Sequence, residues 1–470
     1  MTRSIRVLAV AVAVGFCAVP AARPAGAAPL EREEVDRFVR PLVDGEYCQA
    51  VVVGLVDERG TRLFGYGAKS PADRSAPDGD TVFEIGSVSK VFTSLLLADM
   101  VRAGEVALDD PVQKHLPAGV KVPRKGDEPI TLAHLASHTS GLPRMPDNMT
   151  PKNPANPYAD YTARQMYEFL SRCEPARAAG EAVEYSNLGA ALLGQVLARR
   201  AGKTYEALVL ERICAPLNMG ETRVALPPPM RKRLAPGHDA DGTPAPNWDL
   251  GVFAGAGGLR STGNDMVKFV AANIRPESAG ALAEAIRTAQ APRARADAAN
   301  DVALGWHVQS KDKLVWHNGQ TGGYHSFVGV LPAKGVGVVL LTNGAIPQPD
   351  AAAMALLRRM AGQPSEPPAL RMPVKLSQKE LDAFVGEYAL APAFKLTVTR
   401  EGDRLMSRAT GQGKARIYPS AENEFFYRIV DARITFRRGP GGQVSGLVLH
   451  QNGADLPGPK ANARPATKRP

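Results

Sequence analysis

The hydrophobic pattern divides the chain into two strand-rich ends and a helix-rich middle. Continuous apolar runs at 50–56 and 337–342 predict buried strands, and 62–66 returns as a hairpin partner of the first. Strands at both ends with helices between them predict an α/β (α+β) fold, in which one antiparallel sheet is flanked by helices and carries a helical subdomain. The pattern also predicts helices at 31–42, 87–104, 131–143, 163–173, 187–201 and 351–360, and strands at 314–317 and 327–331.

A proline-rich segment at 363–374 reads as a linker to a second domain. Beyond it, alternating stretches at 395–400, 404–407, 433–437 and 447–450 are separated by glycine-containing turns. This pattern therefore predicts a small antiparallel β-barrel-like domain at residues 375–458. The end of the chain, 459–470, is rich in proline and basic residues, so we expect a disordered tail.

The first 28 residues have the pattern of a signal peptide. Arg3 and Arg6 form a short basic region, 7–19 is apolar but too short to span a bilayer comfortably, and 25–28 offers a small-residue cleavage site near Ala27/Ala28. No later stretch is long and apolar enough for stable membrane insertion. We expect residues 29–362 to form the large domain of a secreted protein, in a bacterial periplasm.

The formal charge of +10 suggests a polyanionic partner at first sight. Seven of the basic residues lie in the leader and the tail, which leaves +3 for the body of the chain, so we expect no nucleic-acid partner. These residues are Arg3, Arg6, Arg23, Lys460, Arg464, Lys468 and Arg469.

Three cysteines remain once the leader is removed: Cys48, Cys173 and Cys214. An odd number allows either one disulfide and a spare thiol or three buried thiols. If a bridge exists, Cys173–Cys214 is favoured, because both residues flank the segment around Tyr185. Neither alternative makes a cysteine catalytic.

A candidate nucleophile begins the predicted helix at 87–104. Ser87 and Lys90 are three positions apart, so both can lie on one helical face, and the free N–H groups of a helix start add partial positive charge. A hydroxyl beside an amine and backbone donors is what an acyl-transfer nucleophile requires. Alone, however, the Ser-x-x-Lys spacing is common.

Two later motifs make the Ser-x-x-Lys spacing more specific. They are Tyr185-Ser186-Asn187 before a predicted helix and His317-Asn318-Gly319 at a predicted strand end. In this order, over residues 31–360, the motifs resemble those of the serine β-lactamase and penicillin-recognising superfamily, in the branch of class C β-lactamases, D-Ala-D-Ala carboxypeptidases and related esterases. The resemblance implies that Ser87 forms an acyl-enzyme. The sequence contains no convincing set of metal ligands and no nucleotide-binding loop, so we expect no cofactor and no metal.

The resemblance also assigns roles to the other residues. Lys90 and Tyr185 handle protons, while Asn187 and His317-Asn318-Gly319 bind substrate. The backbone N–H groups of Ser87 and Gln320 would form the oxyanion hole. Either Tyr185 is the base, with its pKa lowered by charged Lys90 and assisted by protonated His317, or Lys90 is the base, with its pKa lowered by burial. A histidine where class C enzymes have lysine makes carboxylate attraction weaker and dependent on pH.

The expected activity is β-lactam hydrolysis first, with D-alanyl-D-alanine carboxypeptidase or endopeptidase activity on peptidoglycan, or ester hydrolysis, as alternatives. A penicillin-binding module without turnover is the alternative from a different class. The substrate is a small molecule or a peptidoglycan peptide, and the sequence leaves the oligomeric state open.

Two further patterns favour structural roles. His134 and His138 have the spacing of metal ligands but lack the adjacent glutamate of a zinc-protease motif. The glycine-rich segment 254–262 lacks a phosphate-loop ending, so we expect it to shape the cleft wall, with Thr262 and Asp265 capping the next helix.

Overall fold

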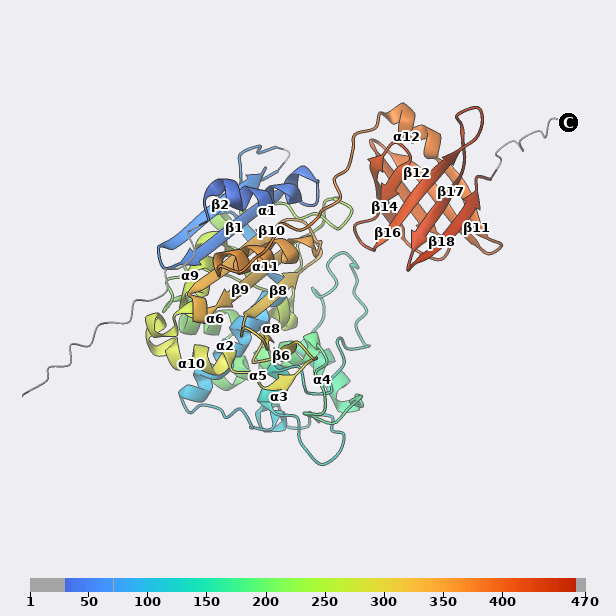
Figure 1. Cartoon of the computed structure of the whole chain (residues 1–470). Helices are drawn as coiled ribbons and strands as arrows, with labels where there is room; N and C mark the ends of the chain where they lie inside the picture. The colour runs from blue at the N-terminus through green and yellow to red at the C-terminus, as the bar shows by residue number, and fades with distance from the viewer. Residues whose placement is uncertain (1–29, 71, 462–470) are drawn as a thin grey trace, which may run out of the picture.

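The computed structural model describes residues 30–70 and 72–461, which form a large α/β domain and a smaller β domain (Figure 1). The predicted signal peptide and most of the predicted basic tail lie outside the described residues. In the large domain, the two ends of the sequence meet in one sheet, as the hydrophobic pattern predicted.

The large sheet has eight strands in the order β2-β1-β10-β9-β8-β7-β6-β5. The hairpin of β1 and β2 is joined on its other side by the last strand of the domain, with Val51 opposite Thr342 and Val56 opposite Gly337. All pairs are antiparallel, which confirms the predicted sheet. The strands are β1 (Ala50–Asp57), β2 (Gly60–Gly67), β5 (Ala294–Arg295), β6 (Asn300–Val302), β7 (His307–Gln309), β8 (Val315–Gln320), β9 (His325–Leu331) and β10 (Val336–Thr342).

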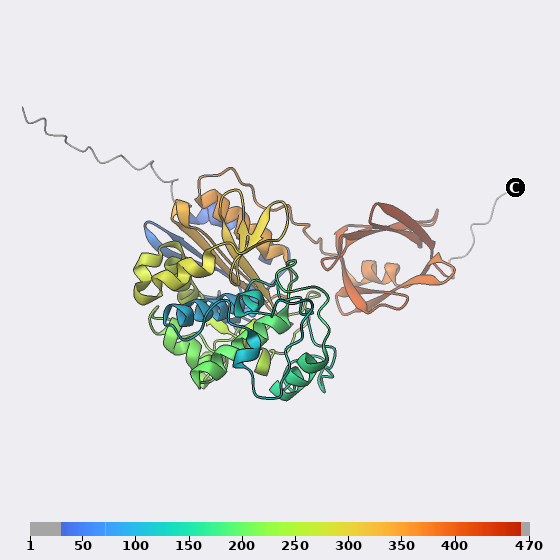
Figure 2. The ribbon, with the colours of Figure 1, turned by 90° about the horizontal axis from the view of Figure 1, so that it is seen from below.

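Successive residues of β1 enter two different cores, because side chains alternate across a strand. Val51 and Val53 pack under α1 (Arg32–Asp44) and α11 (Gln348–Met360). Val52 and Val56 face the opposite core. This core contains α2 (Ser89–Arg102), α9 (Gly263–Ile274) and α10 (Ala283–Gln290), so helices cover both faces of the sheet (Figures 1 and 2).

The inserted helical subdomain packs around α5 (Asn187–Ala201), whose apolar residues join the core of α2. Its other helices and helical turns are η2 (Val112–His115), α3 (Leu132–Ala136), α4 (Ala163–Arg172), α6 (Tyr205–Val209), η3 (Leu210–Cys214), α7 (Pro228–Arg231), η4 (Gly251–Phe253) and α8 (Ala254–Gly257). Two short strands, β3 (Val82–Glu84) and β4 (Arg260–Thr262), pair with each other, and η5 (Pro276–Leu282) and η6 (Pro332–Lys334) are connecting turns.

Cys48, Cys173 and Cys214 are all free thiols, so the Cys173–Cys214 bridge is not formed. Cys48 and Cys214 are buried, whereas Cys173 is partly accessible. For Cys48 and Cys214, the structure agrees with the alternative of buried thiols.

The C-terminal domain is a nearly closed barrel-like sheet, as predicted, with a core of its own. It comprises α12 (Gln378–Phe384), β11 (Gly386–Ala391), β12 (Phe394–Glu401), β13 (Arg404–Ala409), β14 (Lys414–Ala421), β15 (Glu424–Phe426), β16 (Ala432–Arg438), β17 (Val444–Gln451) and β18 (Ala454–Pro459).

One arginine of this domain docks on the large domain. Arg428 donates hydrogen bonds to the carbonyl oxygens of Gly45 and Glu46, the second at 2.6 Å. Its guanidinium lies between the rings of Tyr47 and Tyr418, 4.3 and 3.5 Å from their centroids. The contact is buried and links the two domains directly.

Candidate active site

Ser87 lies in a 3-10 turn, η1 (Gly86–Val88), immediately before α2, which begins at Ser89. Gly86 permits this turn because it has φ +49, where a side chain would be strained. A Cβ on Gly86 would also lie 2.6 Å from the backbone nitrogen of Gln320. The backbone of this turn therefore lies in close contact with the end of β8.

The end of β8 approaches this turn through a second glycine. A Cβ on Gly319 would lie 2.0 Å from the carbonyl oxygen of Ile85 and 2.9 Å from the nitrogen of Ser87. Only glycine at both positions lets the two backbones come this close. The arrangement places the backbone of Gln320 beside Ser87, as the predicted oxyanion hole requires.

Lys90 lies one helical turn after Ser87 and is almost completely buried. Its Nζ is 2.9 Å from Oγ of Ser87 and donates a 2.6 Å hydrogen bond to the carbonyl oxygen of Ala256. Burial, with a smaller contribution from the charge of Arg144, holds the pKa of Lys90 well below its usual value. A lysine in this state is an amine that can accept the hydroxyl proton.

Tyr185 lies next to Lys90, with its ring centroid 4.9 Å from Nζ of Lys90. Burial raises the pKa of Tyr185 to about 12, although a hydrogen bond with Ser87 opposes the shift. Tyr185 is therefore a protonated phenol in the free protein and is suited to donate a proton. Of the two alternatives for the base, these shifts favour Lys90 and not Tyr185.

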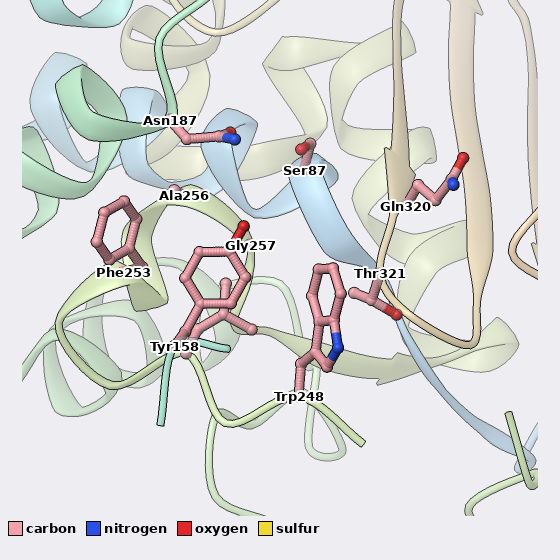
Figure 3. A pocket seen from close by; sticks show the side chains of 10 residues that line it. Ser87, Tyr158, Asn187, Trp248, Phe253, Ala256, Gly257, Gln320 and Thr321 are labelled. Carbon is pink, nitrogen blue, oxygen red and sulfur yellow. The ribbon is translucent and has the colours of Figure 1, made fainter. Parts of the chain in front are cut away.

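Asn187 is the first residue of α5, and Ser186 caps the helix by accepting a 2.9 Å hydrogen bond from the N–H of Gly189. Figure 3 shows the Asn187 amide directed toward the space in front of Ser87. Its Nδ2 lies 3.6 Å from the sulfur of Met145. The side chain thus lines the pocket in front of Ser87.

His317 and Asn318 are placed differently from Asn187. The His317 ring is buried, and burial holds its pKa well below the usual value. Burial therefore disfavours the protonated form, and the prediction that protonated His317 assists Tyr185 is wrong. The amide of Asn318 donates a 2.6 Å hydrogen bond to Asp350. The structure does not bring the Asn318 side chain to the pocket, because neighbouring residues of a strand face opposite sides.

A buried histidine supports Tyr185 from behind. The ring of His138 packs against the Tyr185 ring at a tilt of 32°, with 4.4 Å between centroids, and its Nδ1 accepts a 3.2 Å hydrogen bond from the N–H of Ser186. Burial lowers its pKa to about 3. The nearby His134 instead forms a capping box with Thr131. Both histidines of the pair thus have structural contacts.

The pocket in front of Ser87 has a volume of about 300 Å³, part of which is open to solvent, and it has one aromatic wall. Tyr158 and Trp248 form this wall with ring centroids 5.3 Å apart (Figure 3). The lining residues are Ser87, Tyr158, Asn187, Trp248, Leu250, Phe253, Ala256, Gly257, Gln320 and Thr321. Ala256 and Gly257 confirm that segment 254–262 shapes the cleft wall.

A buried ion pair holds the backbone of this wall in place. Arg260 and Glu84 are 3.3 Å apart, Arg260 donates a 2.7 Å hydrogen bond to the carbonyl oxygen of Trp248, and Glu84 accepts from the N–H of Trp248 at 3.1 Å. Just beyond, Thr262 accepts a hydrogen bond from the N–H of Asp265, as expected of a cap for α9.

Within residues 30–70 and 72–461, no cluster of three or more His, Cys, Asp or Glu side chains could hold a metal ion. No helix in the same ranges is long and apolar enough to cross a membrane.

The family model described as "Beta-lactamase" matches residues 35–363. The chain belongs to the β-lactamase family. A second model, a domain of unknown function (DUF3471), matches residues 370–462. As the motifs indicated, the large domain is a serine hydrolase domain of the β-lactamase and penicillin-binding-protein superfamily.

Relatives of known name cover most of the large domain. The chain is 28% identical to the D-alanyl-D-alanine-carboxypeptidase/endopeptidase AmpH of Escherichia coli (strain K12), over 73% of this chain and 92% of that protein. It is 27% identical to a β-lactamase of Pseudomonas fluorescens, over 70% of this chain and 98% of the relative. A β-lactamase/D-alanine carboxypeptidase structure from Yersinia pestis shares the fold, with a TM-score of 0.61 and 24% identity over 70% and 97% of the two chains.

Several residues of the site carry no motif of their own. Tyr158 and Trp248 lie in irregular segments and join the pocket only through the fold. His307, whose ring centroid is 5.1 Å from that of His317, comes from a short strand that the pattern did not predict. For Arg144, the available signal was its place immediately after the predicted helix at 131–143.

Proposed function

We propose that this protein cleaves an amide of the D-Ala-D-Ala or β-lactam type through an acyl-enzyme on Ser87. The observation that carries the proposal is the contact of 2.9 Å between Ser87 Oγ and the buried Nζ of Lys90. An unprotonated amine at this distance is a general base already in place.

In the proposed acylation, Lys90 takes the proton of Ser87 while Oγ bonds to the substrate carbonyl carbon. The N–H groups of Ser87 and Gln320 stabilise the oxyanion. When the intermediate collapses, the carbon–nitrogen bond breaks and the leaving nitrogen takes the phenolic proton of Tyr185. Tyr185 then regains a proton from Lys90, and water releases the acyl group by the reverse sequence of transfers.

The substrate class within this reaction is also a proposal. The relatives include both a D-alanyl-D-alanine-carboxypeptidase/endopeptidase and β-lactamases. The motif His317-Asn318-Gly319 has histidine where class C β-lactamases have lysine, and a histidine there is typical of some carboxypeptidases and esterases of the superfamily that the chain resembles. We therefore place peptidoglycan-peptide hydrolysis ahead of efficient β-lactam turnover, with ester hydrolysis as a further activity of the same site.

We also propose that the enzyme works outside the cytoplasm after removal of residues 1–28, on the strength of the leader pattern. The domain divisions at 362 and 374 are proposed on the linker composition; the first family match ends at residue 363 and the second begins at residue 370. N-terminal sequencing of the protein exported by a bacterial host tests the first point. A start at residue 1 would contradict it.

The activity test is a substrate panel on the purified mature chain, residues 29–470. It comprises a chromogenic cephalosporin, a D-Ala-D-Ala peptide and a short-chain p-nitrophenyl ester. We expect turnover of the peptide, abolished in Ser87→Ala and kept in Ser278→Ala, an exposed control serine. Tyr185→Phe should lose rate far more than binding. Covalent labelling by the cephalosporin with no turnover of any substrate would instead favour the penicillin-binding module.

A further inference from the structure

Arg144 is fixed at the edge of the active site by its backbone. Its carbonyl oxygen accepts hydrogen bonds from the N–H groups of Asn187 at 3.1 Å and Leu188 at 3.2 Å. These two N–H groups belong to the first turn of α5, where a helix has no partners of its own. Arg144 therefore moves as one unit with Asn187, which faces the pocket.

The side chain of Arg144 extends over Tyr185 and remains exposed. Its guanidinium carbon lies 5.1 Å from the Tyr185 ring centroid. In the described ranges, no carboxylate forms an ion pair with it, in contrast to Arg260, which is neutralised by Glu84. Burying an unpaired charge is costly, but an exposed guanidinium keeps its hydration and its five donors free for a ligand.

The charge of Arg144 matters because burial lowers the pKa of the other basic groups around Tyr185 and so disfavours their charged forms. These groups are Lys90, His138, His307 and His317. An exposed arginine, in contrast, keeps its charge at any working pH. Arg144 is therefore a permanent cation beside this tyrosine.

We propose that Arg144 binds an anionic group of the substrate, a carboxylate in the first place, at the mouth of the pocket beside Tyr185. Guanidinium and carboxylate match in a bidentate geometry, and the partly exposed position allows the ligand to enter and leave. This inference rests on the proposed function and adds a specificity residue to it. Arg144 would supply the attraction for anions that His317 does not.

The kinetic test compares matched substrates that differ by one carboxylate. The acyl-side pair is mono-p-nitrophenyl glutarate and p-nitrophenyl butyrate, and the leaving-side pair is the m-carboxyphenyl and phenyl esters of phenylacetylglycine. We expect Arg144→Gln to lower kcat/KM about tenfold for the carboxylate member of one pair, with the loss mainly in KM. The pair that responds identifies which end of the substrate carries the anion.

Three further arms make the kinetic result specific. The neutral substrates should change less than about twofold, and Arg144→Lys should recover part of the loss. High salt should reduce the wild-type preference for the anion. Arg287→Gln, an exposed arginine of α10, is the control and should behave as wild type. Equal losses on charged and neutral substrates, or no loss on any, would overturn the proposal.

A binding measurement separates this inference from the proposed reaction. In the Ser87→Ala background, calorimetry should show the responding carboxylate ester binding about tenfold more weakly when Arg144 is also replaced by Gln. Undiminished turnover in Ser87→Ala would refute the reaction and leave the binding comparison valid. Equal affinity with and without Arg144 would refute the specificity role and leave the reaction intact.

Discussion

The contact between Gly319 and the Ser87 turn provides a sharp test of the site geometry. In Gly319→Ala, the new Cβ would lie 2.0 Å from the carbonyl oxygen of Ile85, 2.7 Å from Oγ of Ser326 and 2.9 Å from the nitrogen of Ser87. Because ordinary non-bonded contacts of carbon are about 3.5 Å, β8 and the turn must separate by roughly 1 Å. Two of these neighbours are backbone atoms, which cannot rotate away.

This separation moves the N–H of Gln320 away from the oxyanion position. A displacement of about 1 Å can cost about a hundredfold in rate, and loss of one oxyanion donor costs about 10²–10³-fold. We therefore expect kcat of Gly319→Ala to fall at least a hundredfold on an ester substrate. Overpacking should lower the free energy of unfolding by only about 1–3 kcal/mol, so the variant should remain folded.

The matched control is Gly220→Ala, where an added Cβ has open space and φ is not positive. It should retain wild-type rates and a wild-type melting temperature. Circular dichroism and thermal unfolding establish that Gly319→Ala is folded before its kinetics are measured. A folded Gly319→Ala variant with kcat within about threefold of wild type would refute the geometry of the oxyanion hole.

Three further predictions follow from the titration and docking of buried groups. The value of kcat/KM should decrease as the pH is lowered, because protonated Lys90 cannot act as a base. The variant Lys90→Met should lose nearly all activity. The free energy of unfolding should decrease as the pH falls from about 6.5 to 3, because the pKa of His138 is lowered to about 3 in the folded protein. At pH 4.5 the decrease, measured by urea unfolding, should be about 2–3 kcal/mol. The variant His138→Asn should lose less stability between neutral pH and pH 4.5, and asparagine tolerates the positive φ of this position. Arg428→Ala should weaken docking of the C-terminal domain and speed proteolysis in the linker 363–374, while Arg433→Ala, an exposed neighbour, should not.

Each of these predictions has a contradictory result. Activity that keeps rising to about pH 12 would make Tyr185 the base, since its pKa is about 12. Equal acid sensitivity of wild type and His138→Asn would exclude this histidine as the cause. Linker cleavage in Arg428→Ala at the wild-type rate would show that the arginine does not hold the domains together.

The sequence was sufficient for the sheet and for the motif residues because both depend on local pattern. Helix α5 begins and ends where its periodicity predicted, at Asn187 and Ala201. The short strands β5, β6 and β7 were missed, since two or three residues are too few for a period to appear. In the C-terminal domain the antiparallel barrel was predicted, but four of its strands were missed: β11, β14, β15 and β18. β15 has only three residues, and β14 and β18 contain prolines, which interrupt a strand pattern.

The charge states of the site could not be read from the sequence. His317 was expected to be partly charged, and only its burial in the fold makes it neutral. The direction of the Asn318 side chain depends on which face of β8 meets α11, where Asp350 receives it. Burial and side-chain direction depend on the tertiary structure. A motif therefore identifies these residues but does not determine their charge or their orientation.

The central claim is the acyl-enzyme on Ser87, and intact-protein mass spectrometry during turnover tests it most directly. Mixing the mature chain with a p-nitrophenyl ester and quenching in acid should trap one added acyl group. Digestion should place this group on the peptide that contains Ser87, and Ser87→Ala should show no adduct. An adduct on another residue, or the same adduct in Ser87→Ala, would contradict the account.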